Sequence, residues 1–281
     1  MSQRRPPRFA GEEENPHRRD LAALKFRLQE GWAFHQRGQL DQAERVYREV
    51  LTRAPDDFDA LHLLGTLEGE RGNAADALEW FTRAVRVKPH DASAHLNIGI
   101  ALLELRRSEE ALASFQRALG LVPDLAGALN GRGIALLELK RPEEALASFE
   151  RALALAPDFV DALYNRGNAL LRLKRPEAAL ASFDRALMRQ PGDVATLINR
   201  GNALLELKRP EEALVSYDRA LALRPDHSAA HNNRGNALRE LKRLDEAVAS
   251  YDRCLAIDPC DVEALNNRGS ALRELKRHQE A

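Results

Sequence analysis

Cysteine is scarce in this chain, which has two, Cys254 and Cys260, among 281 residues. A disulfide framework or a zinc site needs more thiols, or histidines at set spacing, and the sequence offers neither. Both cysteines are therefore predicted to be ordinary structural residues. The absence of an export signal predicts a reducing, cytoplasmic setting.

Surplus charge of one sign and long apolar runs are also missing. Lys and Arg number 42 against 43 Asp and Glu, so a broad basic field for nucleic acid is excluded. No apolar run approaches the roughly 18–20 residues that a membrane span needs. Residues 1–19 are rich in proline and mixed in charge, without an apolar core, and are predicted to be a flexible lead-in and not a secretory signal.

Catalytic and metal-binding motifs are absent as well. The eight histidines stand in no HExxH motif and no Cys/His cluster. Acidic pairs such as Glu143 and Glu144 lie at predicted helix starts, where the helix dipole accounts for them. The sequence predicts no catalytic residue, no metal and no cofactor, so this chain by itself is not expected to be an enzyme.

What the chain does contain is a repeat with a period of 34 residues. Glycine recurs every 34 residues, at Gly31, Gly65, Gly99, Gly133, Gly167, Gly201, Gly235 and Gly269. Alanine recurs with the same spacing, at Ala43, Ala77, Ala111, Ala145, Ala179, Ala213, Ala247 and Ala281. Proline does so at Pro55, Pro89, Pro123, Pro157, Pro191, Pro225 and Pro259. A fixed period of this length predicts stacked supersecondary units.

The unit over residues 160–193 predicts two helices. The first is expected from about Asp161 to Lys174. The second begins at Pro176, because proline suits the first helical position, and its apolar face includes Ala179 and Phe183. Small residues are expected where the two helices approach closely. Phe183 and its equivalents fill the space between units, so stability depends on repeat-to-repeat interfaces.

The residues Gly167, Ala179, Phe183, Ala186 and Pro191 together resemble the tetratricopeptide repeat. The resemblance covers residues 20–281, in seven complete units and a partial eighth: 24–57, 58–91, 92–125, 126–159, 160–193, 194–227, 228–261 and 262–281. It implies an all-α, right-handed superhelical solenoid of antiparallel helix hairpins, in which the first helix of each unit lines a concave groove. The eighth unit stops at the packing residue Ala281. This ending predicts either a fragment or an end that docks onto another chain.

One departure from the family pattern is a row of arginines just before the repeat glycine, at Arg132, Arg166, Arg200, Arg234 and Arg268. Their stems can cover apolar surface while their heads reach an acid. Asp184, Asp218 and Asp252 are the expected partners. The alternative is that the row binds a ligand.

A row of asparagines is the feature of the sequence that most favours a binding function. They recur two residues before the glycine and one residue after it, at Asn97, Asn165, Asn199, Asn233 and Asn267 and at Asn168, Asn202 and Asn236. Residues three apart share a helix face, and an amide both donates and accepts. The row is therefore predicted to bind the backbone of extended peptides. The alternative is that the amides bond to one another and tile the helix interfaces.

The predicted groove is asymmetric, because the asparagine row is broken at Gly131. The part of the groove nearer the N-terminus is more apolar and contains Trp32, His62, Thr66, Ile100 and Ile134. The part nearer the C-terminus is flanked by the arginines Arg172, Arg239 and Arg273. This pattern predicts a hydrophobic anchor early in the groove and extended backbone late.

The NRGNAL segments at 165–170, 199–204 and 233–238 resemble the repeat domain of O-GlcNAc transferase-like glycosyltransferases. That resemblance implies asparagines that hold a protein substrate. Three functions are therefore open: a scaffold that binds protein or peptide partners, the substrate-recruiting arm of such an enzyme, or self-assembly through the C-terminal repeat.

Overall fold

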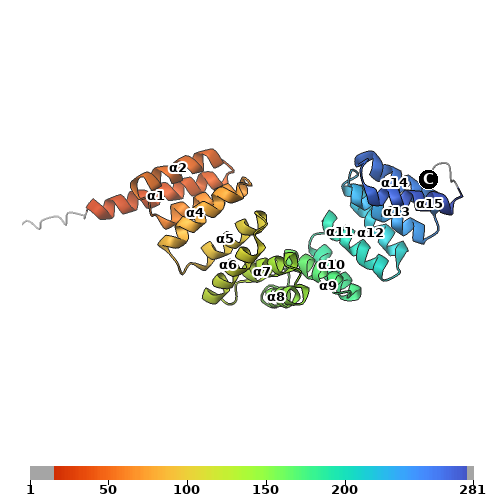
Figure 1. The fold of residues 1–281 in the computed structure, drawn as a ribbon. Coiled ribbons are helices and arrows are strands. Elements are labelled where there is room, and N and C mark those ends of the chain that lie inside the picture. The colour runs from red at the N-terminus through yellow and green to blue at the C-terminus, as the bar shows by residue number, and fades with distance from the viewer. Residues whose placement is uncertain (1–15, 277–281) are drawn as a thin grey trace, which may run out of the picture. The chain divides into compact units, whose positions relative to one another are not determined.

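The computed structural model describes residues 16–276, which form helices joined by short turns, and no strand occurs in this range (Figure 1). The first helix begins at Pro16. Residues 16–19 lie in this helix. The rest of the expected lead-in, residues 1–15, and the last residues of the eighth unit, 277–281, lie outside the described range.

The chain divides into two compact units, between Arg107 and Ser108. Unit 1 contains α1 (Pro16–Gln36), α2 (Leu40–Arg53), α3 (Phe58–Glu70), α4 (Ala74–Val87) and α5 (Ala92–Glu104). Unit 2 contains α6 (Ser108–Leu121), α7 (Ala126–Glu138), α8 (Pro142–Leu155), α9 (Val160–Arg172), α10 (Pro176–Arg189), α11 (Val194–Glu206), α12 (Pro210–Leu223), α13 (Ser228–Glu240), α14 (Leu244–Ile257) and α15 (Val262–Glu274).

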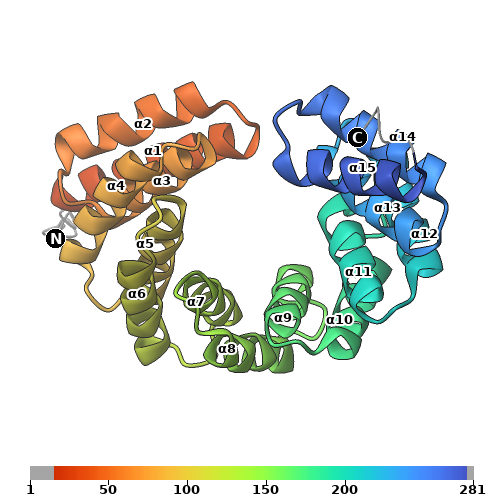
Figure 2. The same cartoon turned by 45° about the vertical axis from the view of Figure 1, so that its right-hand side comes forward.

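Within each unit the helices pack in the order of the chain. An odd-numbered helix pairs with the even-numbered helix that follows it, as α9 does with α10, and that helix packs on the next hairpin. Odd-numbered helices also touch the next odd-numbered helix, whereas no two even-numbered helices of residues 16–276 do. The odd-numbered helices therefore form the inner face of each unit (Figure 2). The predicted all-α solenoid of antiparallel hairpins is confirmed.

A left-handed residue ends each inner helix. In α9 this residue is Lys174, at φ 55°. The N–H of Arg175 donates to the carbonyl of Leu170 at 2.9 Å and that of Lys174 to Leu171 at 3.0 Å, which is the Schellman arrangement. The helix expected to reach Lys174 therefore ends at Arg172. Glycine supplies the same turn in the first two hairpins, at Gly38 and Gly72, and a basic residue supplies it later, at Arg106, Lys140, Lys174, Lys208, Lys242 and Lys276.

The repeat glycine gives room to the aromatic side chain of the outer helix. A Cβ atom on Gly167 would lie 2.4 Å from the ring of Phe183, which is fully buried. Gly131, where the asparagine row is broken, has a similar neighbour, because a Cβ there would lie 2.5 Å from Phe115. Any larger residue at position 131 would collide with that ring.

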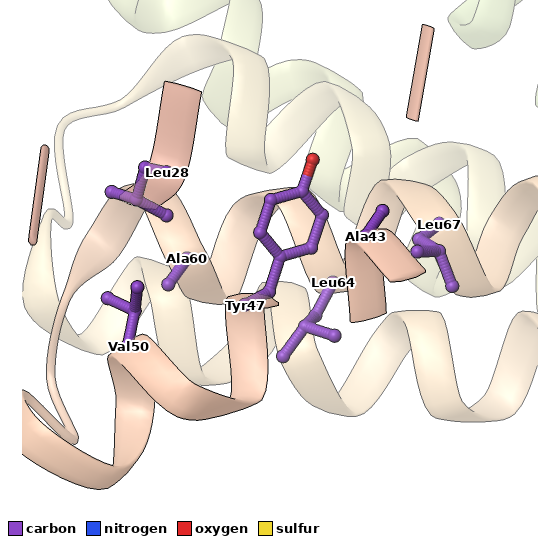
Figure 3. Packing of buried hydrophobic residues seen from close by; sticks show 7 residues of the cluster. All are labelled: Leu28, Ala43, Tyr47, Val50, Ala60, Leu64 and Leu67. Atoms are coloured by element: carbon purple, nitrogen blue, oxygen red, sulfur yellow. The ribbon is translucent and has the colours of Figure 1, made fainter. Parts of the chain in front are cut away.

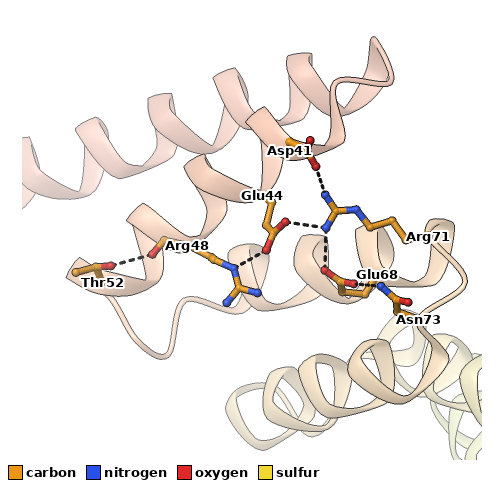
Figure 4. A network of polar contacts seen from close by, with 7 residues as sticks. All are labelled: Asp41, Glu44, Arg48, Thr52, Glu68, Arg71 and Asn73. Atoms are coloured by element: carbon orange, nitrogen blue, oxygen red, sulfur yellow. Dashed lines mark hydrogen bonds and ion pairs between the residues drawn. The ribbon is translucent and has the colours of Figure 1, made fainter.

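The core of unit 1 follows the same pattern. Tyr47 takes the place of the phenylalanine and lies among small and branched apolar side chains of α1, α2 and α3 (Figure 3). Arg71 then ties the following turn to α2, through Asp41 at 2.6 Å and Glu44 at 2.7 Å (Figure 4). Apolar packing thus lies inside the hairpins, and ion pairs close their outer surface.

The arginine row links the outer helices of consecutive hairpins. Arg200 donates through Nε to Asp184 on the preceding outer helix at 2.6 Å, and through Nη1 to Ser216 on its own at 2.6 Å. Arg234 repeats this arrangement with Asp218 and Ser250, and Arg268 pairs with Asp252 at 2.5 Å. The three expected aspartate partners are confirmed, and these guanidinium groups are engaged within the protein.

Candidate peptide-binding groove

The asparagines of unit 2 lie on the inner helices and bond to one another across successive hairpins. Asn199 donates to Asn168 Oδ1 at 2.8 Å, and Asn233 donates to Asn202 Oδ1 at 2.9 Å. Asn165 donates to the Oδ1 atom of Asn130 at 3.1 Å. The side chains of the row are half-buried. Asn168, Asn199, Asn202 and Asn233 therefore form one hydrogen-bonded chain, and Asn165 forms a separate pair with Asn130. Together the amides of these inner helices are called the amide band.

Each amide on α9 and α13 is held at one end only. Asn168 and Asn236 accept through Oδ1, and the described residues provide no acceptor for their Nδ2 groups. Asn165 and Asn233 donate through Nδ2, and no donor to their Oδ1 atoms occurs within residues 16–276. Each of the two helices thus offers one open acceptor and one open donor, three residues apart on one face.

The amides on α11 are differently placed. Asn199 uses Nδ2 twice, toward Asn168 and toward the hydroxyl of Tyr164 at 3.2 Å, and its Oδ1 lies 3.4 Å from Asn202 Nδ2. Asn202 Oδ1 accepts from Asn233 and also from the Tyr217 hydroxyl at 2.8 Å. Most of the hydrogen-bonding capacity of α11 is therefore used inside the protein.

Two buried tyrosines of the outer helices donate hydrogen bonds to asparagines of the inner helices. Tyr217 and Tyr251 are fully buried and donate to the Oδ1 atoms of Asn202 and Asn236, both at 2.8 Å. Burial raises the pKa of Tyr251 to about 12 and also raises the pKa of Tyr217. Both hydroxyls therefore stay protonated and can donate at neutral pH.

Asn130 and Asn232 belong to the same network of amides, although they stand outside the asparagine row that the sequence predicts. Asn130 accepts from Asn165, and Asn232 accepts from Asn267 at 3.1 Å. Both are nearly buried, at 8% and 3% exposure. Each stands one residue before the row, in the same register as Tyr164. That shared register is the signal that could have identified them.

The inner face of unit 1 carries two cavities in place of an amide band. The larger, of about 460 Å³, lies between α1 and α3 and is lined by Lys25, Leu28, Gln29, Trp32, Asp59, His62 and Leu63. Trp32 is 43% exposed there. His62 accepts from Asn97 through Nε2 at 2.8 Å, and burial lowers its pKa, so the ring is neutral. Lys25 and Asp59 contribute one charge of each sign to the lining, and the exposed indole beside a neutral imidazole suits an apolar side chain.

The second cavity of unit 1, of about 230 Å³, lies between α3 and α5. It is lined by Gly65, Thr66, Gly69, Glu70, Ala77, Phe81, Asn97, Ile100, Ala101 and Glu104. The structure therefore brings Trp32 together with His62 in one cavity, and Thr66 together with Ile100 in the other.

The remaining residues of the predicted groove lie in unit 2. Ile134 is on α7 and is half-buried. Arg172 donates to the carbonyl oxygen of Leu137 at 2.7 Å and so bridges α9 to α7. Arg239 is half-buried on α13, and Arg273 is exposed on α15. Arg172 therefore has a structural contact that its sequence position did not predict.

Within residues 16–276 no group of three or more His, Cys, Asp or Glu side chains is placed to hold a metal ion. Cys254 is buried and Cys260 is exposed, and neither forms a disulfide. None of the helices in the described range combines the length and the apolarity that crossing a bilayer requires.

Family models agree with the architecture. A model described as tetratricopeptide repeat matches residues 28–92, 62–126, 130–194 and 198–261, and a second with the same description matches 250–281. The chain belongs to the tetratricopeptide-repeat family. Tetratricopeptide arrays are interaction modules, whose stacked hairpins present extended inner surfaces. No curated protein matches the chain.

Solved structures similar to this tetratricopeptide-repeat protein include YrrB, described as having an unusual peptide-binding site. YrrB is 27% identical with a TM-score of 0.57, over 66% of this chain and 96% of that chain. TTC0263 of Thermus thermophilus is 26% identical with a TM-score of 0.52, over 65% and 100%. PilF of Pseudomonas aeruginosa, 21% identical with a TM-score of 0.67 over 76% and 97%, shares the fold.

Proposed function

We propose that the chain binds extended peptide segments of partner proteins, and that the inner helices of unit 2 hold the peptide backbone. The observation that carries this proposal is the pairing of one open acceptor with one open donor on α9 and again on α13. A peptide backbone presents one N–H and one C=O per residue, so each asparagine pair can satisfy both groups.

The similarity to YrrB, a repeat protein described by its peptide-binding site, is consistent with this function. Contacts to backbone groups give affinity with little dependence on sequence. Unit 1 by itself offers a feature that gives selectivity, namely the side-chain cavity that Trp32 and His62 line. The partner is accordingly a protein segment with an accessible backbone and at least one apolar anchor.

The test uses a variant that removes the open donors and keeps the internal bonds. In Asn168→Asp/Asn236→Asp, the retained oxygen still accepts from Asn199 or Tyr251, while the outward amino group is lost. Two backbone hydrogen bonds at roughly 1 kcal/mol each predict an affinity about 30-fold lower. Peptides selected on the wild-type chain from a synthetic library are titrated by fluorescence anisotropy.

The matched control adds the same two charges to the outer helices of the same hairpins, as Ala181→Glu/Ala249→Glu, at exposed positions of α10 and α14. This control is expected to bind like the wild type, and both variants are expected to keep the wild-type urea midpoint. Equal affinities for the wild type and the double aspartate variant would contradict the proposal.

A further inference from the structure

The smaller cavity of unit 1 combines an apolar interior with two carboxylates. Phe81 and Ala101 are buried, at 4% exposure each, and form its interior. Glu70 and Glu104 are exposed and are the last residues of α3 and α5. Both helices therefore direct the negative ends of their dipoles toward the same opening.

The cavity exists because Gly69 lacks a side chain. A Cβ atom built on this helical residue meets nothing within 4 Å. In the following four repeats the equivalent position is leucine, at Leu103, Leu137, Leu171 and Leu205. A leucine is thus compatible with the helix at this register, and glycine leaves the space open in the second repeat.

The negative charge at the opening is incompletely compensated. The neighbouring Glu68 is buried and is bonded to Arg71 at 3.1 Å and to Asn73 at 2.7 Å (Figure 4). Glu70 accepts from His35 Nε2 at 2.9 Å through one oxygen, and the described residues offer its other oxygen no donor. Glu104 has no bonded or charged partner within residues 16–276.

We propose that this cavity binds a lysine or arginine side chain of the peptide partner, an assignment that rests on the proposed peptide-binding function. The aliphatic stem of such a side chain would lie against Phe81 and Ile100, and its cationic head would reach Glu70 and Glu104. An apolar or acidic side chain would leave Glu104, and the second carboxylate oxygen of Glu70, without a partner.

The test compares residue preference as well as affinity. A positional library of short peptides, acetylated at the N-terminus only, is selected for binding to the full wild-type chain, to the Gly69→Leu variant and to the Glu104→Gln variant. The wild type is expected to enrich lysine or arginine at one position. Glu104→Gln is expected to bind the selected basic peptide about tenfold more weakly, through loss of one charge-assisted hydrogen bond. Gly69→Leu fills the cavity and is expected to abolish the preference.

The controls make the same chemical changes outside the cavity. Gly120→Leu alters an exposed helical glycine of α6 with open space around it, and Glu79→Gln removes an exposed carboxylate of α4. Both are expected to keep the wild-type preference. Peptide binding by the wild type without enrichment of lysine or arginine would overturn the cavity assignment and leave the groove function standing. Failure of every library peptide to bind would overturn both.

Discussion

Arg132 differs from the other arginines of its row in having no carboxylate at the equivalent position of the preceding outer helix. Its Nε atom is buried without a hydrogen-bond partner in the described structure. The residue sixteen positions earlier is an aspartate or a glutamate for the four later arginines, and here it is Gln116. One position of α6 therefore decides whether the Nε atom of this guanidinium has a carboxylate partner.

Replacing Gln116 with Asp is expected to stabilise unit 2 by about 1 kcal/mol, because a buried donor without a partner costs roughly 1–3 kcal/mol. Asp184 bonds Arg200 from the equivalent position at 2.6 Å. The measurement is the urea midpoint of unfolding. Gln116→Asn, which has the shape of the aspartate side chain without its charge, is the control. A midpoint that does not rise above this control would show that the introduced carboxylate fails to reach Arg132.

Sequence patterns predicted which residues share the amide row but not how each amide is oriented. The 34-residue period is enough to place Asn165 and Asn168 on one face of one helix. Which end of each amide is free depends on neighbours 31 or 35 residues away, such as Asn199 and Asn130, and on the buried hydroxyls behind them. That information is three-dimensional, so the peptide-binding role of the row stays a prediction.

At the scale of a helix pair, the repeat glycine limits how closely the inner and outer helices approach. Gly167→Ala would place a methyl group 2.4 Å from the Phe183 ring. Overpacking of this kind is expected to destabilise the protein by about 1–3 kcal/mol. Thermal unfolding monitored by circular dichroism is the measurement.

Gly120→Ala is the matched control for that change, because it is a helical glycine whose added methyl group meets nothing within 4 Å. Its expected effect has the opposite sign, a gain of about 0.5–1 kcal/mol from helix propensity. Equal effects of the two substitutions would contradict the packing role of Gly167.

Helix boundaries were predicted well where a single residue determines them and less well elsewhere. Pro176 starts α10 as expected, because proline fits the first helical turn. The sequence predicts that α9 ends at Lys174, two residues beyond its observed end at Arg172, since Lys174 carries no sequence sign of its left-handed conformation. In the first two hairpins the same turn is recognisable in the sequence, because glycine occupies the left-handed position, at Gly38 and Gly72.

At the scale of the whole molecule, stacking means that a substitution which destabilises one hairpin also destabilises the hairpins next to it. Ala179 is fully buried in α10. Ala179→Leu is expected to lower hydrogen-exchange protection in its own hairpin and in residues 126–159 and 194–227, because each hairpin is stabilised by its neighbours. Ala181→Leu, exposed on the same helix, is the control. Unchanged exchange in the two flanking segments would rule out this coupling.

The division of the chain between Arg107 and Ser108 was not foreseen from the sequence. The packing alanines continue across it without a change of step, at Ala77, Ala111 and Ala145. A repeat pattern reports which residues face a neighbour, and it does not report how tightly successive hairpins join. The likeness to glycosyltransferase arms and the self-assembly of the last repeat likewise stay predictions.

On α9 and α13 each asparagine of the row is hydrogen-bonded at only one end of its amide. Deamidation therefore has different consequences at different positions. Direct hydrolysis of the Asn168 or Asn236 amide to aspartate would leave an oxygen in the bonded position, so the melting temperature would change little. The groove would nevertheless exchange a donor for a negative charge. Deamidation of Asn165 or Asn233 would instead break the internal bond and register as lost stability. An aged preparation would therefore be fully folded and yet lack the open donors on which the proposed peptide binding depends.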